Sequence, residues 1–198
     1  MKIESLVLAS NNNHKISEIK SLLADCHIRI LTRSDFNEFP DIEETGATLK
    51  DNALLKSRAI CAKYKLPALA DDSGLEVDFL NGQPGVLSAR YAGEGCTFAD
   101  NNRKLLKQLD GVPDEKRGAR FVTVLALSAT EGEYCFEGEV RGVITESEQG
   151  SNGFGYDPVF YYPPLKKTFA QLAANEKNGV SHRANALLKF KKWLLENT

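Results

Sequence analysis

The sequence predicts a mixed α/β fold in which one central sheet, not purely parallel, is flanked by helices. Strand-like and helix-like segments alternate in the first part of the chain, as is typical of strands joined by helices. Later, the β-rich segments ARFVTVLALSAT and YCFEGEVRGVIT flank a short turn that contains a glycine, which predicts an antiparallel hairpin. The chain has 198 residues, of which 42% are hydrophobic, enough for one core. We therefore expect residues 1–198 to form a single domain.

The first elements follow from hydrophobic patterning. Residues 3–9 are rich in Ile, Leu and Val and fit a buried strand. Ile16, Ile19 and Leu23 then recur at helical spacing, behind an asparagine that can cap the helix. The segment IRIL, which starts at Ile28, predicts a short second strand. The segment EFPDIEETG that comes later predicts a loop, because it is rich in acids and contains Pro and Gly.

A second helix is expected from about Thr48 to Lys65, where apolar residues can share one face. The run PALADDSG that follows predicts a short strand ending in two acids and a glycine. The segment LEVDFLNGQPG alternates in polarity and then turns at Asn81 and Gly82, a pair that signals a β-hairpin.

Residues at helix starts place the remaining helices. Thr97 followed by Asp100 resembles the N-cap of a helix that reaches Leu109. The segment EQGSNGFGYDPVF predicts a glycine-rich loop that enters another strand, and the last helix is expected to start near Ser181.

Composition and charge exclude several classes of protein. The formal net charge is -2, so no broad attraction to nucleic acid or anionic lipid is expected. The basic segment KFKKW leaves RNA binding as one alternative, but the solvated face of a terminal helix explains it better. No apolar run approaches the roughly 20 residues of a membrane helix. The 4 cysteines are scattered without a metal-binding or disulfide spacing. We expect a cytoplasmic protein with reduced cysteines, without a nucleic-acid or membrane partner.

The segment SNNNHK, from Ser10 to Lys15, lies where a predicted strand gives way to a helix. Unpaired backbone N–H groups and the positive end of a helix dipole form an anion site at such a junction. Lys15 adds a point charge that suits phosphate. The structural alternative is a capped helix with a solvated lysine. The segment is not a P-loop, since the glycines and the Lys-Ser/Thr pair of that motif are missing.

Two acidic segments, EETG and ADDSG, are candidates for a cation site. A strand that ends in Asp71 and Asp72 would place their carboxylates at its carboxyl edge, where open α/β sheets bind ligands. Such hard oxygens bind Mg²⁺, usually together with substrate phosphates, and Glu43 or Glu44 could add a ligand. The alternative is an Asx turn, because Asp-Asp-Ser-Gly is good turn sequence. Lys56 lies within a predicted helix, and its spacing does not decide which face it occupies.

Two later segments could contact a base or an anion. In GSNGFGYDP the glycines allow the backbone to approach a ligand, Phe154 could stack on a base and Asp157 could accept hydrogen bonds from it. A bulged strand entry with Phe and Tyr in the core is equally consistent. In NEKNGVSHRANALL, His182 and Arg183 fall in the first turn of a helix, where positive charge opposes the helix dipole. A ligand with an anionic or carbonyl group would explain them; exposed side chains are the alternative.

Taken in this order, the segments make the chain resemble the inosine triphosphate pyrophosphatase family, which removes ITP, dITP and XTP. The resemblance covers nearly the whole chain. It rests on SNNNHK, EETG, NALLKSRA, ADDSGLEVD, PGVLSARYAG, GFGYDPVF and EKNGVSHR. One departure is that Asn11 replaces the glycine of the Thr-Gly-Asn opening that bacterial members often have. The resemblance implies two lobes around a nucleotide cleft, Mg²⁺ as cofactor, a purine nucleoside triphosphate as substrate, and a homodimer.

The resemblance also implies a role for each matching residue. In the first motif, Asn12 and Lys15 hold the triphosphate, and Lys56 assists. Glu44 and Asp72 look like the Mg²⁺ ligands, Asp72 also looks like the general base, and Asp71 supports them. The full set of implied substrate-binding residues is Ser10, Asn11, Asn12, Asn13, His14, Lys15, Lys56, Ser73, Phe154, Gly155, Tyr156, Asp157, Lys177, His182 and Arg183. Among these, Phe154 stacks under the purine, and Lys177, His182 and Arg183 read its 6-keto edge.

The implied reaction is NTP + H₂O → NMP + pyrophosphate. A broader nucleotide pyrophosphatase and an inert nucleotide-binding module are the alternatives. The paired aspartates with two lysines favour an enzyme, because an inert module has no need of a carboxylate that activates water.

Overall fold

The computed structural model describes residues 3–197 and has a mixed α/β fold, as predicted. Seven strands within these residues form one sheet in the order β2-β1-β3-β4-β5-β6-β7. β1 is parallel to β2 and β3, whereas β6 is antiparallel to β5 and β7. The strands are β1 (Ser5–Leu8), β2 (Arg29–Leu31), β3 (Ala68–Val77), β4 (Gly118–Ala129), β5 (Gly132–Ile144), β6 (Phe160–Tyr162) and β7 (Lys167–Thr168). β4 and β5 are neighbours joined by two residues, so the predicted hairpin is confirmed.

Three of the helices begin at or beside residues that the sequence marks as helix starts, whereas α4 was not predicted and begins after Ala173 without a side-chain cap. The Asn12 side chain caps α1, and capping boxes of Thr48 with Asp51 and of Thr97 with Asp100 begin α2 and α3. The helices of residues 3–197 are α1 (Asn13–Leu22), α2 (Leu49–Tyr64), α3 (Phe98–Gln108), α4 (Ala174–Val180) and α5 (His182–Asn197). Among them, no helix is long and apolar enough to cross a membrane.

The chain divides into two compact units. Unit 1 contains the described residues of Met1–Asp72, Thr123–Gly138 and Arg183–Thr198, and unit 2 contains Ser73–Val122 and Glu139–His182. That residues 1–198 act as a single domain stays a prediction.

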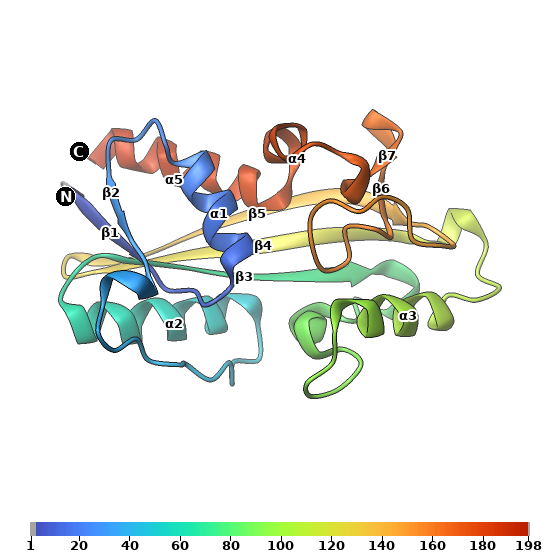
Figure 1. Cartoon of the computed structure of the whole chain (residues 1–198), viewed down its shortest axis with the longest axis horizontal. Coiled ribbons are helices and arrows are strands. Elements are labelled where there is room, and N and C mark those ends of the chain that lie inside the picture. Colours follow the sequence, from blue (N-terminus) through green and yellow to red (C-terminus); the bar gives the residue numbers. More distant parts are fainter. Residues whose placement is uncertain (1–2, 198) are drawn as a thin grey trace. The chain divides into compact units, whose positions relative to one another are not determined.

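In unit 1, helices cover both faces of the strands. α1 and α5 lie on one face and α2 on the other (Figure 1). β1 contributes side chains to the core on both faces of the sheet, because alternate side chains of a strand point to opposite faces. Leu6 and Leu8 pack in the cluster that contains Ile19 of α1 and Phe190 of α5. Val7 packs in the cluster that contains Ile60 of α2.

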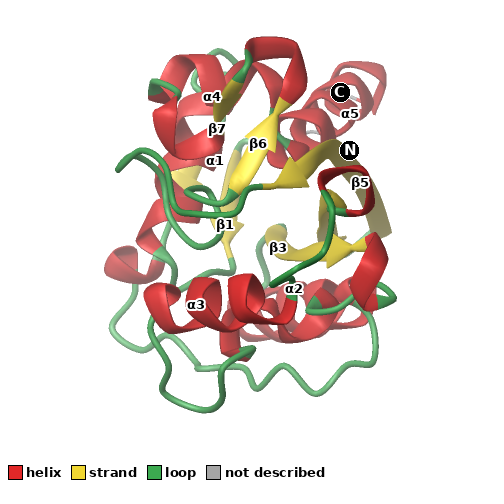
Figure 2. Cartoon of the chain, turned by 90° about the vertical axis from the view of Figure 1, so that its right-hand side faces the viewer, coloured by secondary structure: helices red, strands yellow, loops and turns green. Residues whose placement is uncertain are grey.

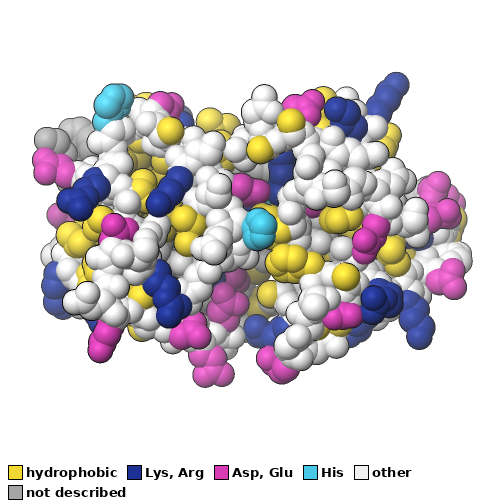
Figure 3. All heavy atoms as spheres, in the orientation of Figure 1, with side chains coloured by type: hydrophobic (Ala, Val, Ile, Leu, Met, Phe, Trp, Pro, Cys, Tyr) yellow, Lys and Arg dark blue, Asp and Glu magenta, His cyan; other side chains and the backbone are white. Residues whose placement is uncertain are grey.

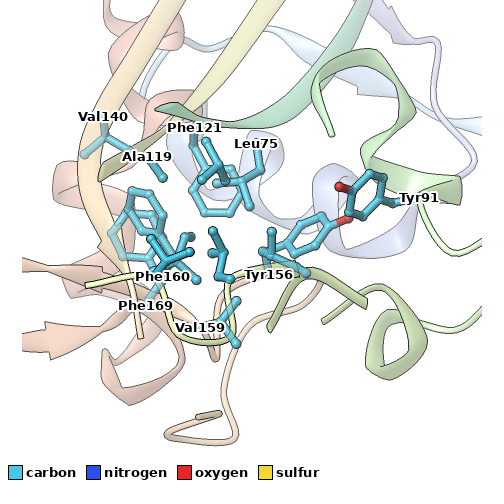
Figure 4. Packing of buried hydrophobic residues seen from close by; sticks show 14 of the residues in the cluster. Leu75, Tyr91, Ala119, Phe121, Val140, Tyr156, Val159, Phe160 and Phe169 are labelled. Atoms are coloured by element: carbon cyan, nitrogen blue, oxygen red, sulfur yellow. The ribbon is translucent and has the colours of Figure 1, made fainter. Parts of the chain in front are cut away.

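In unit 2, α3 lies on one side of the strands and α4 on the other (Figure 2). Its core is rich in aromatic side chains (Figure 4). The Phe121 ring lies 4.6 Å from the Phe160 ring and 5.9 Å from the Phe169 ring, measured between centroids. Such aromatic clusters bury large areas and hold their ring orientations well. This core anchors the glycine-rich loop described below.

Two predictions about the segment after α2 are wrong. The strand does not end at Asp71 and Asp72: β3 runs on through both to Val77. The expected hairpin at Asn81 and Gly82 is a turn without a second strand, because only an isolated bridge joins Glu76 to Pro84 among the described residues. Proline has no N–H group to extend a ladder, which limits pairing at this point.

Candidate active site

Asp71 and Asp72 are the centre of the candidate site in unit 1. Only 1% of Asp71 and 5% of Asp72 is exposed. As successive residues of β3 they point to opposite faces of the strand. Asp71 contacts side chains of α1 and α5, and Asp72 contacts side chains of α2. Each carboxylate therefore has its own set of partners.

On the first face, two cations hold Asp71. Arg183 donates to Asp71 Oδ2 from Nε at 3.1 Å and from Nη2 at 3.0 Å, and Lys15 Nζ lies 3.3 Å from the same oxygen. Arg183 Nη1 donates to Glu18 of α1. Burial by itself would raise the pKa of Asp71, but the charges of Lys15, Arg183 and Lys56 outweigh it and hold the pKa far below the usual range. Asp71 is therefore an ionised counter-ion at neutral pH.

On the second face, Lys56 joins the two carboxylates that were predicted to bind metal. Its Nζ donates to Glu44 Oε1 at 2.7 Å, to Asp72 Oδ1 at 3.0 Å and to the backbone oxygen of Asp71 at 2.8 Å. Burial raises the pKa of Asp72, although Lys56 and Lys15 oppose the shift. Burial also disfavours the charged form of Lys56, but Asp72, Glu44 and Asp71 raise its pKa overall. The face of α2 that Lys56 occupies, which its spacing did not decide, is therefore the buried one.

The two acids Glu44 and Asp72 fit a Mg²⁺ ion by donor chemistry. Both offer hard carboxylate oxygens, and both contact the same lysine nitrogen, so they face a common space. Glu43, the alternative ligand, is exposed. No group of three or more acidic, His or Cys side chains arranged for a metal occurs among the described residues. Mg²⁺ commonly binds one or two protein carboxylates together with substrate phosphates, so Glu44 and Asp72 are the residues that would hold it.

The N-terminal motif forms a capped helix start rather than a row of unpaired amides. Asn12 Oδ1 accepts hydrogen bonds from the backbone N–H groups of His14 at 3.0 Å and Lys15 at 3.2 Å. Those two amides, which were expected to be open to an anion, are therefore already paired. Ser10 Oγ accepts from the N–H of Asn12, and His14 and Asn13 are exposed. The positive charge available to a phosphate here comes mainly from Lys15.

Asn11, which replaces the family's glycine, ties the motif to its neighbours. Its Nδ2 donates to Asp41 Oδ1 at 3.0 Å, and its Oδ1 accepts from Arg33 Nη1 at 3.3 Å. It is not among the described non-glycine residues with positive φ. The backbone here thus does not require glycine.

In unit 2, Lys177, Phe154 and Asp157 form a second candidate group. Lys177 Nζ lies 2.6 Å from Asp157 Oδ2 and 4.8 Å from the centre of the half-buried Phe154 ring. Asp157 Oδ2 also accepts from the backbone N–H of Phe154 at 2.8 Å. A Cβ on Gly153, which has φ +75°, would lie 2.0 Å from that oxygen. Asp157 therefore shapes the loop and fixes Phe154 and Lys177; its carboxylate is already engaged.

The position of Tyr156 is compatible with the implied role of shaping the glycine-rich loop, and its contact with substrate stays a prediction. This residue is 4% exposed and lies in the aromatic core with Leu75 and Val159 (Figure 4). Its hydroxyl donates to the backbone oxygen of Ser88 at 2.9 Å. Tyr156 therefore anchors the glycine-rich loop to the core, and its side chain leaves little surface for contact with substrate.

The remaining predicted site residues lie in both units. His182 in unit 2 is 4% exposed and stacks on Phe121, with ring centroids 4.7 Å apart and planes 13° apart. Ser73 is half-buried on β3, and the oxygen of Gly155 accepts from Asn102 Nδ2 at 3.1 Å. Arg183 belongs to unit 1 and directs all its guanidinium nitrogens to carboxylates. These contacts favour a role in the carboxylate network over the predicted contact with a base.

Two residues in the network were not predicted from the sequence. Glu18 lies three positions after Lys15 on α1 and contacts Arg183. Asn52 lies four positions before Lys56 on α2 and contacts Asp72. Helical spacing from a predicted lysine is the signal that could have found both residues.

Buried acids and lysines with shifted pKa values beside a helix start are typical of enzyme sites that bind phosphate groups. The sequence pattern of the Ham1 family matches residues 6–193, and the chain belongs to this family. It is 49% identical over 191 residues to a dITP/XTP pyrophosphatase of Thermoanaerobacter pseudethanolicus, covering 96% of each chain.

Solved structures agree with this assignment. A HAM1 protein from Coxiella burnetii is 43% identical with a TM-score of 0.89, covering 99% of this chain and 100% of that one. The Staphylococcus aureus Ham1 protein is 42% identical with a TM-score of 0.88, covering 98% and 100%. The resemblance stated from the motifs is thereby confirmed, as is the predicted fold class.

Proposed function

We propose that this chain is a nucleoside triphosphate pyrophosphatase that hydrolyses dITP, XTP and ITP to the monophosphate and pyrophosphate. The name of the close Thermoanaerobacter relative, dITP/XTP pyrophosphatase, supports the activity and the substrate class. The observation that carries the proposal is the buried cluster in which Lys56 joins Glu44 to Asp72. The match to the Ham1 family and the name of this relative support a role in nucleotide metabolism.

The pKa values of the two aspartates shift in opposite directions, which supports different roles for them. Asp72, whose pKa is raised by burial, is the better proton acceptor and serves as the general base toward the attacking water. Asp71, whose pKa is lowered, is a poor base and instead anchors Lys15 and Arg183. Because Lys15 and Lys56 contact these carboxylates, their ammonium groups are held where they can donate to phosphate oxygens.

The cofactor that we propose is Mg²⁺, held by Glu44 and Asp72. Bound there, it would neutralise charge on the phosphate oxygens as the bond to the α-phosphate breaks. The protein contributes the fixed placement of both carboxylates, which Lys56 holds in position.

The base is expected to bind in unit 2, against the Phe154 ring beside Lys177. Lys177 carries donors only, and hypoxanthine and xanthine present an acceptor at position 6. Adenine presents an amino donor there, so ATP would leave a buried donor facing another donor. Such a mismatch costs roughly 1–3 kcal/mol, about 10- to 100-fold or more in selectivity. His182 stacks on Phe121 and is proposed to complete this edge.

The resemblance to the family also supports a homodimer located in the cytoplasm, and we include both in the proposal. Charged side chains of both signs are interspersed on the faces of the two units seen in Figure 3. Light scattering during size exclusion measures the mass: a mass near twice 21.8 kDa supports the dimer, and a mass near 21.8 kDa contradicts it.

Product analysis tests the activity directly. The purified protein with Mg²⁺ is incubated separately with dITP, XTP, ITP, GTP, ATP and CTP, and the products are separated by chromatography. Monophosphate and pyrophosphate from dITP, XTP and ITP, with little from ATP and CTP, are expected. Equal turnover of CTP would indicate a broader pyrophosphatase. Diphosphate and orthophosphate would overturn the mechanism, and binding of ITP without turnover would indicate an inert module.

A further inference from the structure

Asn52 connects the two segments that carry the proposed metal ligands. This residue of α2 is fully buried. Its Oδ1 accepts from the backbone N–H of Gly46 at 2.7 Å, two residues beyond Glu44, and its Nδ2 donates to Asp72 Oδ2 at 3.4 Å. A single amide group therefore spans from the Glu44 loop to β3.

Lys56, one turn later on α2, makes a second connection between the same two segments. It donates to Glu44 Oε1 and to Asp72 Oδ1. The two oxygens of Asp72 are thus divided between Asn52 and Lys56. Residues four apart share one face of a helix, so one face of α2 provides the hydrogen bonds that hold the Glu44 segment and Asp72.

The two connections differ in charge, and this difference matters once substrate is present. The ammonium group of Lys56 is attracted to phosphate and is proposed to donate to it. The amide of Asn52 is neutral, so it is not drawn away from the loop and the strand by phosphate charge. The contact with the loop is also close: a Cβ on Gly46 would lie 2.6 Å from Asn52 Oδ1 and 2.9 Å from Asn52 N. Asn52 is therefore suited to hold the two segments while Lys56 acts on substrate.

We propose that Asn52 is a positioning residue that fixes the separation of Glu44 and Asp72 and thereby sets the affinity for the divalent cation and the turnover rate. The inference rests on the proposed function, in which these two carboxylates hold the cation. The side-chain hydrogen bonds described for Asn52 join it to Gly46 and Asp72. They involve neither the ammonium groups proposed to bind phosphate nor the residues of unit 2 proposed to bind the base. Its loss should therefore lower kcat and leave KM nearly unchanged.

The test compares Asn52→Ala and Asn52→Asp with Ser57→Ala. Ser57 is a matched control because it is buried on the same helix and its hydroxyl bonds only to Ser128 Oγ at 2.8 Å and Leu54 O at 3.2 Å among the contacts of the described residues. Three quantities are measured: kcat and KM for dITP, binding of Mn²⁺ without nucleotide by electron paramagnetic resonance, and the midpoint of thermal unfolding. Ser57→Ala is expected to lower the midpoint while kcat and Mn²⁺ affinity stay at wild-type values.

Asn52→Ala is expected to lower kcat and Mn²⁺ affinity by about 10- to 100-fold, as is usual for residues that orient metal ligands, with KM changed less than about 3-fold. Asn52→Asp keeps the shape and the acceptor for Gly46 N–H and changes the contact with Asp72, and the thermal unfolding midpoint reports whether each variant folds. Asn52→Asp still loses kcat, because Asp72 then faces a carboxylate in place of a donor.

Wild-type kcat and Mn²⁺ affinity in Asn52→Ala, or wild-type kcat in Asn52→Asp, would overturn the inference. A failure of the proposed function is distinguishable from this outcome. A wild-type protein that hydrolyses no nucleotide refutes the function, whereas the Mn²⁺ comparison among the variants still decides the role of Asn52.

Discussion

Asp71 and Asp72 are neighbours in the sequence but have pKa values shifted in opposite directions. Both are buried, so burial alone does not separate them. The difference lies in the balance of charge: Asp71 faces Lys15, Arg183 and Lys56, whereas nearby Glu44 opposes part of what Lys56 does for Asp72. Replacing either aspartate with asparagine removes its charge without changing its shape, and so tests the role proposed for that residue.

The variant Asp72→Asn is expected to fold and to bind ITP but to lose turnover. Loss of a general base typically lowers the rate by about 10²- to 10⁴-fold. Pyrophosphate release gives kcat, and calorimetry with ITP gives binding. Retained turnover in this variant would remove Asp72 from the role of base.

The variant Asp71→Asn is expected to be destabilised at pH 7 by about 3–5 kcal/mol, because Lys15 and Arg183 would lose their buried counter-charge. The sign of the pH dependence follows from the lowered pKa. The stability from ionised Asp71 is present above its unfolded pKa of about 3.9 and is lost as pH falls toward the lower folded value. Urea unfolding from pH 7 to pH 3 should give a constant difference from wild type above about pH 5 and a shrinking one below about pH 4. A difference that grows as the pH falls would contradict the assignment.

The two faces of a helix contribute unequally to the free energy of unfolding, and α5 is an example. Phe190 is fully buried against Phe136, with ring centroids 5.4 Å apart, whereas Leu195 is 83% exposed. We expect Phe190→Ala to lower the free energy of unfolding by about 3–5 kcal/mol. Leu195→Ala, the control on the same helix, should change it by less than about 0.5 kcal/mol. Chemical denaturation measures both values; similar losses would mean that the exposed face of α5 is covered in solution.

Elements also show what the sequence could predict. Asn12, Thr48 and Thr97 mark helix starts because capping is local, and each starts a helix in the structure. The course of β3 could not be predicted, because Asp-Asp-Ser-Gly is locally a turn sequence. The strand continues because cations from distant parts of the chain, among them Arg183, neutralise the acids.

At the candidate site, too, some features could be predicted from the sequence and others could not. Glu44, Lys56 and Asp72 were predicted from motifs, and the structure brings them together. Phe154 and Tyr156 could not be separated by sequence, since both are aromatic residues of one glycine-rich loop. Only packing decides that Tyr156 enters the core while Phe154 stays half-buried.

For the molecule as a whole, we expect folding not to require a metal at the site. Its buried acids are already paired with Lys15, Lys56 and Arg183. We therefore expect EDTA to abolish hydrolysis of dITP while the thermal unfolding midpoint changes by less than about 2 °C, because Asp71 and Asp72 keep their cationic partners when the metal is removed. Activity assays and circular dichroism test this. A large fall in the midpoint, or activity that survives EDTA, would contradict the expectation.

The alternation of β3 has a consequence for how this protein can change over generations. Because adjacent positions of a strand face opposite ways, deleting or inserting one residue before Asp71 would exchange the surroundings of the two acids. The carboxylate of Asp72, which now contacts Lys56, would then face Lys15 and Arg183. The carboxylate of Asp71 would face α2 instead. Reading-frame-preserving losses of a single codon in this strand should therefore be purged by selection, even where many point substitutions nearby are tolerated.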